Sequence, residues 1–321
     1  MSLSSGSFPE LSELQPLSTL VDWIRFTATA MEQHGCFYGH GCADPLSEAR
    51  FLVLRGLQLD WDLPDSYLTA QLLAAEKQQL YSLIEQRCLV KVPVAYLLEE
   101  AWYFNEPFHV TPAVLVPRSP IGELIERHFE PWLEHEPTRL LDLCTGSGCI
   151  GIAMARAFPE AQVHLTDLSE AAIDIAVENV SAKDLGYQVE VYQGDLFEGL
   201  PGECYDLIVS NPPYVDAEDI ADMPEEFHHE PRLGLAAGDD GLDLVHSILL
   251  QAPDYLTDDG WLICEVGNSA VALMETYPEI PFEWPEFAQG GHGVFVISAQ
   301  TLKQHQDSIK NRLYSQNKGS D

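Results

Sequence analysis

The sequence predicts an α/β fold: a mostly parallel sheet with helices on both faces and an antiparallel last strand, joined to a small N-terminal helical domain. From Arg139 onward, strand-like and helix-like segments alternate, which is typical of a parallel sheet with crossover helices. Before residue 93 the apolar residues show helical spacing instead. The 321 residues suffice for one domain of roughly 200 residues and another of about 100.

The N-terminal part, residues 1–92, reads as a helical domain. Apolar residues at helical spacing predict helices over about 17–33 and 70–90. Between them, Asp44 before Pro45 predicts an N-cap with proline at the first helical position.

Residues 93–118 differ in composition from the helical part before them and predict a β-hairpin linker. Tyr, Trp, Phe and Val are dense there, and Asn105-Glu106-Pro107 can turn the chain. A helix capped by Ser119 then opens the second domain, 119–302.

The second domain contains the alternating strand-like and helix-like segments. Strands are predicted at 139–144, 162–167, 189–194, 205–210 and 260–266, and the helices between them at 149–158, 169–182 and 242–256. Residues 282–287 and 291–299 leave no room for a helix, so we expect an antiparallel hairpin at one sheet edge. The last residues, 303–321, read as a polar tail with a frayed helix at best.

Composition narrows the class of protein. No apolar run approaches a membrane span, and the N-terminus lacks a basic segment followed by an apolar one, so we expect a cytoplasmic protein. The seven cysteines are scattered without a CxxC pair, which argues against disulfides and structural zinc. Adjacent His228 and His229 point to different sides of an extended chain, so no metal site is predicted.

The charge is strongly acidic. The chain has 16 basic and 51 acidic residues and a formal net charge of −35, so it would repel a nucleic-acid backbone and attract a basic protein. The alternative is that the acidity serves only solubility.

A glycine loop follows the first strand of the alternating region. Gly146 to Gly151 fit the pattern G-x-G-x-x-G between a strand and a helix. Such glycines let a ligand approach the backbone, and the helix N-terminus offers N–H groups. The pattern alone is a weak signal, because glycine turns after strands are common.

Three carboxylates strengthen the case for a nucleoside cofactor. Asp142 lies inside the first strand, where it could face an ammonium group, while Asp167 ends the second strand and could accept both ribose hydroxyls. Asp195 ends the third strand and could meet an adenine edge. Each alone could be a cap or a loop residue. A nicotinamide dinucleotide is compatible with these residues, but Asp142 and the antiparallel end of the sheet argue against it.

The fourth strand ends in Asn211-Pro212-Pro213-Tyr214. If the cofactor is S-adenosylmethionine, the Asn211 Oδ1 and the Pro212 carbonyl can hold the two N–H groups of a planar –NH₂ while charge develops on its nitrogen. The prolines stiffen this clamp and the Tyr214 ring can stack on the planar group. The simpler interpretation is a strand-ending turn.

Four segments in order resemble a known family: FHVTPAVLVPR, LDLCTGSGCIGIA, SNPPYV and EPRLGLAAGDDGLDL. The chain is similar to the HemK/PrmB-type enzymes, class I (Rossmann-like) S-adenosyl-L-methionine-dependent methyltransferases that modify the side-chain amide of glutamine in proteins. The resemblance implies that the helical domain recognises the protein substrate. It implies cofactor contacts from Asp142, Thr145, Gly146, Ser147, Gly148, Asp167, Leu168, Asp195, Leu196 and Asn211. It implies catalytic roles for Asn211, Pro212 and Tyr214, and glutamine binding by these residues with Pro213 and Arg118.

Within this family the chain most resembles the PrmB branch, which acts on large-subunit (50S) ribosomal protein L-three. FYGHG, VPRSPIGELI, EFHHEPRLGLAAG and GGHGVFVIS point there. The release-factor branch usually has Pro-Glu-Thr or Pro-Asp-Thr after Pro-Arg, where this chain has Ser119-Pro120-Ile121, and it prefers glycine at Cys144. A release-factor methyltransferase, an adenine amino-group methyltransferase and a non-catalytic assembly factor are the alternatives.

Two charged groups have more than one interpretation. Arg118 could pin the hairpin through a carboxylate or contact substrate directly. Glu230 and Arg232 belong to a long loop that could fold over the substrate. Cys144 and Cys149 flank the glycine loop but are not expected to be nucleophiles, since methyl transfer needs no covalent enzyme intermediate.

Overall fold

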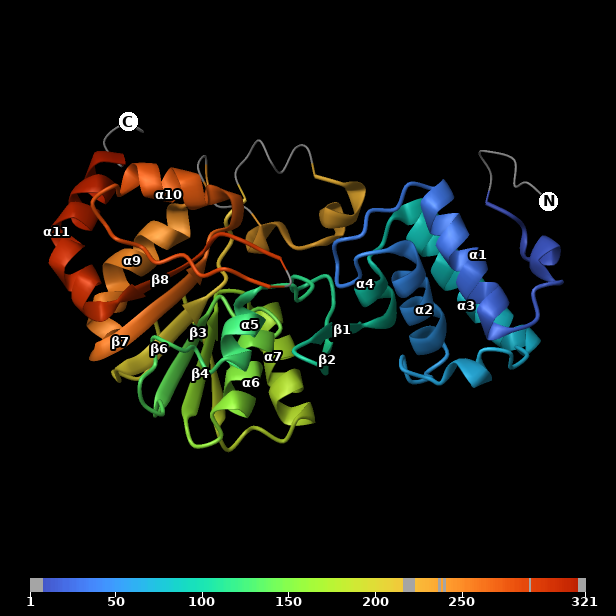
Figure 1. Ribbon diagram of the computed structural model, residues 1–321, viewed down its shortest axis with the longest axis horizontal. Helices are drawn as coiled ribbons and strands as arrows, with labels where there is room; N and C mark the ends of the chain where they lie inside the picture. The colour runs from blue at the N-terminus through green and yellow to red at the C-terminus, as the bar shows by residue number, and fades with distance from the viewer. Residues whose placement is uncertain (1–7, 216–222, 236–237, 239–240, 289, 317–321) are drawn as a thin grey trace. The chain divides into compact units, whose positions relative to one another are not determined.

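The computed structural model describes residues 8–215, 223–235, 238, 241–288 and 290–316 (Figure 1). The chain forms two compact units. The first comprises Met1–Trp102, Val110–Pro112 and Pro224–His229, and the second comprises Tyr103–His109, Ala113–Met223 and Glu230–Asp321. Within the described residues, no helix is long and apolar enough to cross a membrane.

The first unit is helical, as its spacing predicts. Helix α2 begins where the Asp44 carboxylate accepts hydrogen bonds from two backbone N–H groups of the first turn. The third predicted helix is shorter than expected, because α3 begins only at Ala74 and its last turn widens into the π-helical η3. The elements are η1 (Leu11–Leu14), α1 (Leu20–Gln33), α2 (Pro45–Gly56), η2 (Asp65–Tyr67), α3 (Ala74–Glu85), η3 (Gln86–Val90) and α4 (Val94–Leu98).

A buried arginine joins distant segments of the first unit. Arg87 is 1% exposed, and its Nε lies 2.6 Å from Glu48 Oε1 while its Nη1 lies 2.8 Å from Glu226 Oε1. Its Nη2 donates to the Phe37 carbonyl. Glu226 belongs to η4 (Glu225–His229), so a piece of the long loop after β6 is built into the helical unit. Removing Arg87 would leave two buried carboxylates without their cation, which is strongly destabilising.

The predicted hairpin linker was partly wrong. Residues Val94–Leu98 form helix α4, and only β1 (Glu100–Tyr103) and β2 (Glu106–His109) form the two-stranded sheet. The chain reverses at Phe104 and Asn105, which have φ of 52° and 60°. The density of aromatic and β-branched residues suggested strand throughout, but the five residues after Pro93 close helical hydrogen bonds instead.

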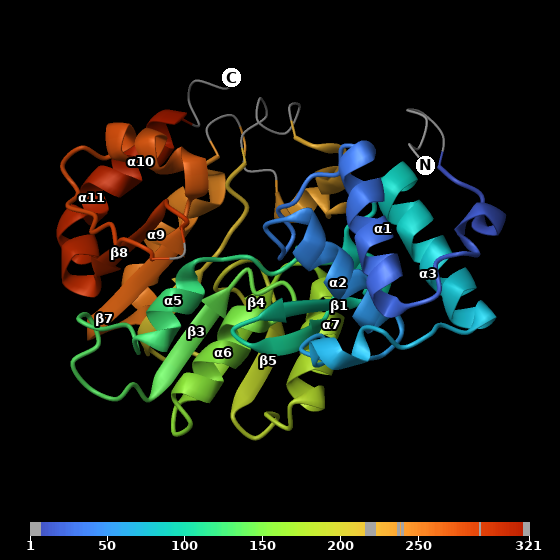
Figure 2. The same ribbon diagram turned by 45° about the vertical axis from the view of Figure 1, so that its right-hand side comes forward.

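The second unit holds the predicted sheet. Its strand order is β5-β4-β3-β6-β7-β8, parallel except for β8, which pairs antiparallel with β7. Figure 2 shows β5 and the β7–β8 pair at opposite edges. The strands are β3 (Arg139–Leu143), β4 (Gln162–Asp167), β5 (Val189–Gln193), β6 (Tyr205–Ser210), β7 (Leu256–Glu265) and β8 (Val294–Ser298).

Helices cover both faces of this sheet (Figure 1). Successive strand residues point to opposite faces, so Leu140 packs in one apolar cluster and Leu141 in the other. One cluster joins the sheet to α5 (Ile121–Glu126), α6 (Cys149–Ala157) and α7 (Glu170–Ala182). The other joins it to α9 (Asp243–Tyr255), α10 (Ala270–Thr276) and α11 (Ala299–Gln316).

The C-terminal part differs from the expectation in two ways. Residues 282–287 do not form a hairpin strand, since only an isolated bridge joins Glu283 to Val296, and β8 pairs with β7 instead. The polar-tail prediction was also wrong for residues 303–316, which belong to α11. This helix is polar on average, but Leu302 and Ile309 are fully buried against the sheet unit, and a stripe this narrow is easily missed.

The buried stripe of α11 can be tested directly. Ile309→Asp would place an unpaired charge in the apolar cluster and should lower the free energy of unfolding by about 3 kcal/mol or more. Gln304→Asp, on the exposed side of the same helix, should change it little. Urea unfolding measures both, and equal effects would contradict the packing of α11.

Candidate active site

The sheet register brings the predicted site residues together at the carboxyl ends of the parallel strands, which we call the carboxyl edge of the sheet. Thr166, Leu143, Ser210 and Cys264 lie level on the neighbouring strands β4, β3, β6 and β7. The residues that follow them are therefore Asp167, the start of the glycine loop, Asn211 and Glu265. Open α/β sheets bind ligands at this carboxyl edge.

The glycine loop after β3 is anchored by two of the predicted carboxylates. Asp142 Oδ2 accepts hydrogen bonds from Thr145 Oγ1 at 2.6 Å and from the Gly151 N–H at 2.9 Å. Asp167 Oδ2 accepts from the Gly146 N–H at 2.9 Å. These bonds fix the loop between the ends of β3 and β4.

Asp142 is placed differently from the expectation that it faces an ammonium group. Its side chain is 0% exposed, so it supports the loop from below and presents no surface to a ligand in this structure. Burial raises its pKa to about 7. Its Oδ1 has no hydrogen-bond partner among the described residues, which adds to the penalty on the ionised form.

The loop itself has room above it. Gly146 has φ of 55°, and a Cβ built on it would meet nothing within 4 Å, so the backbone is open to an approaching molecule. Cys144 also has a positive φ, 57°, which is unusual for a residue with a side chain. Glycine adopts this left-handed backbone conformation without steric cost, which explains why the release-factor branch prefers glycine at the position of Cys144.

The remaining predicted cofactor residues divide by exposure. The Asp195 side chain and Leu168 are exposed beyond β5 and β4, and Asp167 is half-buried with its pKa raised by burial. Ser147 and Leu196 are buried, so their side chains belong to the packing of the edge. Among the described residues predicted to bind the cofactor, Asp167 and Asp195 are therefore the carboxylates with surface available to a ligand.

The Asn-Pro-Pro-Tyr segment follows β6 at the same edge. Pro212 and Pro213 are buried, whereas Asn211 and Tyr214 are half-buried. The Tyr214 hydroxyl donates to Glu265 Oε1 at 2.9 Å. The sequence analysis did not identify Glu265, although a carboxylate ending the apolar run GWLICE was a visible signal.

Arg118 pairs with a carboxylate, which is one of the two roles that the sequence predicts for it. Its Nη1 and Nη2 lie 2.6 and 2.8 Å from the two oxygens of Glu230, whose side chain is 0% exposed. Glu230 Oε1 also accepts from the Val116 N–H. This pair ties the segment before α5 to the returning end of the loop after β6. Contact of Arg118 with substrate stays a prediction.

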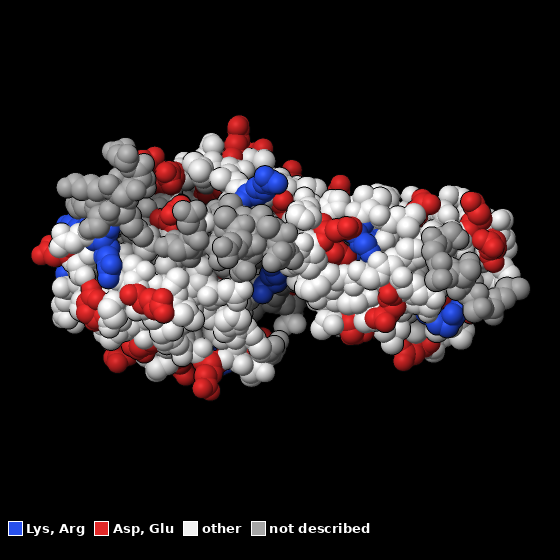
Figure 3. Space-filling view, turned by 90° about the horizontal axis from the view of Figure 1, so that it is seen from above, with Lys and Arg blue, Asp and Glu red and all other residues white. Residues whose placement is uncertain are grey.

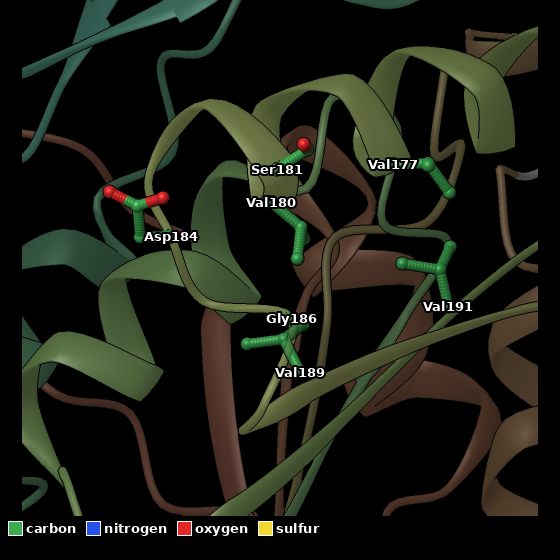
Figure 4. A pocket seen from close by; sticks show the side chains of 7 residues that line it. All are labelled: Val177, Val180, Ser181, Asp184, Gly186, Val189 and Val191. Carbon is green, nitrogen blue, oxygen red and sulfur yellow. The ribbon is translucent and has the colours of Figure 1, made fainter.

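Two other features lie away from this edge. A hollow of about 470 Å³ between α7 and β5 is lined mainly by Val177, Val180, Val189 and Val191, and Figure 4 shows these side chains facing it. It adjoins the beginning of β5, not the carboxyl ends of the strands. His229 contacts the Val90 carbonyl within the first unit, and no group of three potential metal ligands occurs in the described part of the chain.

Comparison with known proteins identifies the family. Residues 127–238 match the methyltransferase small domain. The chain is 43% identical, over 92% of its length and 94% of the relative, to the ribosomal protein uL3 glutamine methyltransferase of Francisella tularensis. It is 47% identical to the enzyme of the same name from Xanthomonas campestris, over 91% of this chain and 95% of that one. The chain belongs to this glutamine methyltransferase family.

Family membership confirms the resemblance inferred from the four segments, including its PrmB-like branch, and the methyltransferase fold class. It also confirms that the protein is an enzyme. Among solved structures, a methyltransferase from Pyrococcus furiosus is 17% identical with a TM-score of 0.44, covering 70% of this chain and 98% of that one.

The buried Asp142 predicts a pH dependence of stability. Its folded pKa of about 7 lies above its ordinary value of 3.8, so between these values the folded chain holds a proton that the unfolded chain has released. This contribution to the free energy of unfolding is therefore present at low pH and is lost as the pH rises toward 7. Asp142→Asn should lose less stability over this range. Urea unfolding at about pH 5 and about pH 8 measures the difference, and parallel losses in both proteins would contradict it.

The Arg118–Glu230 pair predicts an asymmetric mutational response. Arg118→Met leaves the buried Glu230 carboxylate without its cation and should lower the free energy of unfolding by about 3–5 kcal/mol. Arg127→Met removes the exposed pair with Glu123 and should cost less than about 1 kcal/mol. Similar losses for both variants in urea unfolding would argue against the buried pair.

Proposed function

We propose that this methyltransferase transfers a methyl group from S-adenosyl-L-methionine to the side-chain amide nitrogen of a glutamine in large-subunit ribosomal protein uL3, the protein L-three, in the cytoplasm. The observation that carries the proposal is the position of Asn211-Pro212-Pro213-Tyr214 at the sheet edge that also holds the glycine loop. The named relatives at 43% and 47% identity support the same substrate.

The residues at this edge fit the cofactor. The open backbone at Gly146 provides space beside the loop, and the exposed carboxylates suit a positively charged nucleoside. We assign Asp167 to the ribose hydroxyls, Asp195 to the adenine, and the segment 145–148 to the methionine end, with Asp142 holding that segment in place. When bound, S-adenosylmethionine supplies an electrophilic methyl group on a positively charged sulfur.

The clamp addresses the weak nucleophilicity of an amide. The lone pair of the glutamine nitrogen is delocalised into its carbonyl, so the nitrogen becomes reactive only as its geometry turns tetrahedral and positive charge develops on it. We assign Asn211 Oδ1 and the Pro212 carbonyl as acceptors for its two N–H groups. The buried prolines hold these acceptors fixed, so they favour the transition state without reorganising. The N–C bond forms as the C–S bond of the sulfonium breaks, the thioether leaves as a neutral product, and the methylated nitrogen then loses one proton to solvent. No titrating base is required beforehand.

The acidity of the chain suits a basic partner. Figure 3 shows acidic side chains scattered over the visible face with few basic ones among them. A distribution of this kind attracts a basic ribosomal protein over a distance. We assign recognition of uL3 to the helical first unit, which leaves the second unit for the chemistry.

Replacing Asn211 tests this function. Asn211→Ala removes one acceptor and should slow methyl transfer at least roughly a hundredfold. The control is Asn311→Ala, an exposed position on α11, which should leave the rate unchanged. The measurement is transfer of label from S-adenosylmethionine to glutamine in ribosomal proteins from cells that lack the modification. Full activity of Asn211→Ala, or label on a protein other than uL3, would contradict the proposal.

A further inference from the structure

A buried carboxylate lies directly behind the glutamine clamp. Glu265 is 5% exposed and follows Cys264, which lies level with Ser210 across the β6–β7 pair. Its Oε1 accepts from the Tyr214 hydroxyl at 2.9 Å, and its Oε2 accepts from the Ser119 hydroxyl at 2.6 Å. Each oxygen of this buried group therefore has a hydroxyl donor, the arrangement a buried carboxylate needs.

The ring of Tyr214 rests on backbone. A Cβ added to Gly267 would lie 2.5 Å from Tyr214 Cε2, closer than any real contact, so only hydrogen fits there. Gly267 is backed by Gly293, the last glycine of the GGHG segment, whose carbonyl accepts from the Gly267 and Val266 N–H groups. A Cβ on Gly293 would lie 2.1 Å from the Gly267 carbonyl oxygen.

The backbone of Tyr214 is held as well. Its carbonyl accepts from Ser269 Oγ at 3.0 Å, and the following Val215 N–H donates to the Leu235 carbonyl at 2.9 Å. The residue is thus fixed at its hydroxyl, one edge of its ring and its carbonyl. A residue whose side chain is held at two points and whose backbone is held at a third is preorganised, because little rotational freedom remains to be lost when a ligand binds.

We propose that Glu265 is a positioning residue for methyl transfer: with Ser119 as its second partner, it holds the Tyr214 ring as a fixed wall for the planar carboxamide of the substrate glutamine. This inference rests on the proposed function. It gives a role to three sequence features that the clamp alone leaves unused, namely Ser119 after Pro-Arg, the carboxylate ending β7 and the GGHG segment.

A purely structural role for Glu265 makes a different prediction. A buried carboxylate bears a large desolvation penalty, so a neutral isostere is often neutral or stabilising for the fold. Glu265→Gln keeps the shape and one acceptor oxygen but cannot accept from both hydroxyls. Positioning therefore predicts lost activity with retained stability, whereas a structural role predicts that both fall together.

A double-mutant cycle tests the coupling to Tyr214. Glu265→Gln loses the charged acceptor of the Tyr214 hydroxyl, and Tyr214→Phe loses the hydroxyl itself, so both disrupt the same interaction and each should lower kcat/KM for uL3 roughly tenfold. The double variant should be no slower than either single variant. The control is Asp206→Asn at the other end of β6, where the carboxylate accepts from the Thr138 N–H, and it should leave kcat/KM unchanged. Losses that multiply in the double variant would overturn the positioning role.

A second readout needs neither cofactor nor substrate. In protein labelled with ¹³Cζ-tyrosine, the Tyr214 signal is the one missing from Tyr214→Phe. Glu265→Gln should shift this signal and Asp206→Asn should not. An unshifted signal overturns the positioning role even if activity falls. A wild-type enzyme that labels no glutamine overturns the proposed function instead, so the two failures are distinguishable.

Discussion

The register of the parallel sheet is the constraint on which the site depends. Because β4, β3, β6 and β7 lie level, the residues just beyond their ends meet at one edge, although they come from positions far apart in the chain. A shift of any strand by one residue would turn its apolar side chains toward the opposite face. The two apolar clusters, which use alternate residues of β3, β6, β7 and β8, therefore fix the carboxyl edge as firmly as they fix the core.

In the proposed mechanism, rigid groups at this edge compensate for the weak nucleophilicity of the glutamine amide. A glutamine amide is a poor nucleophile, so rate must come from acceptors and walls that are in place before the reaction begins. In the proposed mechanism, the buried prolines after β6 hold the acceptors in place, and the backbone N–H groups of Gly146 and Gly151 fix the glycine loop by donating to Asp167 and Asp142. Buried carboxylates recur in these roles because one carboxylate can accept several hydrogen bonds in a fixed geometry.

The strand–helix alternation and the local motifs were predictable from sequence because they depend on short-range spacing. The glycine loop, the position of Asn211-Pro212-Pro213-Tyr214 after a strand and the antiparallel last strand were all predicted in this way. Pairings across long separations were not: Tyr214 and Glu265 are 51 residues apart, and Arg87 and Glu226 are 139 apart. Helix α4 was missed because its residues favour strands, and α11 because its buried stripe is narrow. Burial of Asp142 depends on how α6 packs over β3, which spacing does not reveal.

The most direct test of the central claim compares ribosomal protein uL3 from cells with and without this gene by mass spectrometry. The account predicts that one glutamine of uL3 carries an added methyl group only when the gene is present, and that glutamines of release factors do not depend on it. Identical uL3 from both kinds of cell would contradict the account, as would a modification that moves to a release factor.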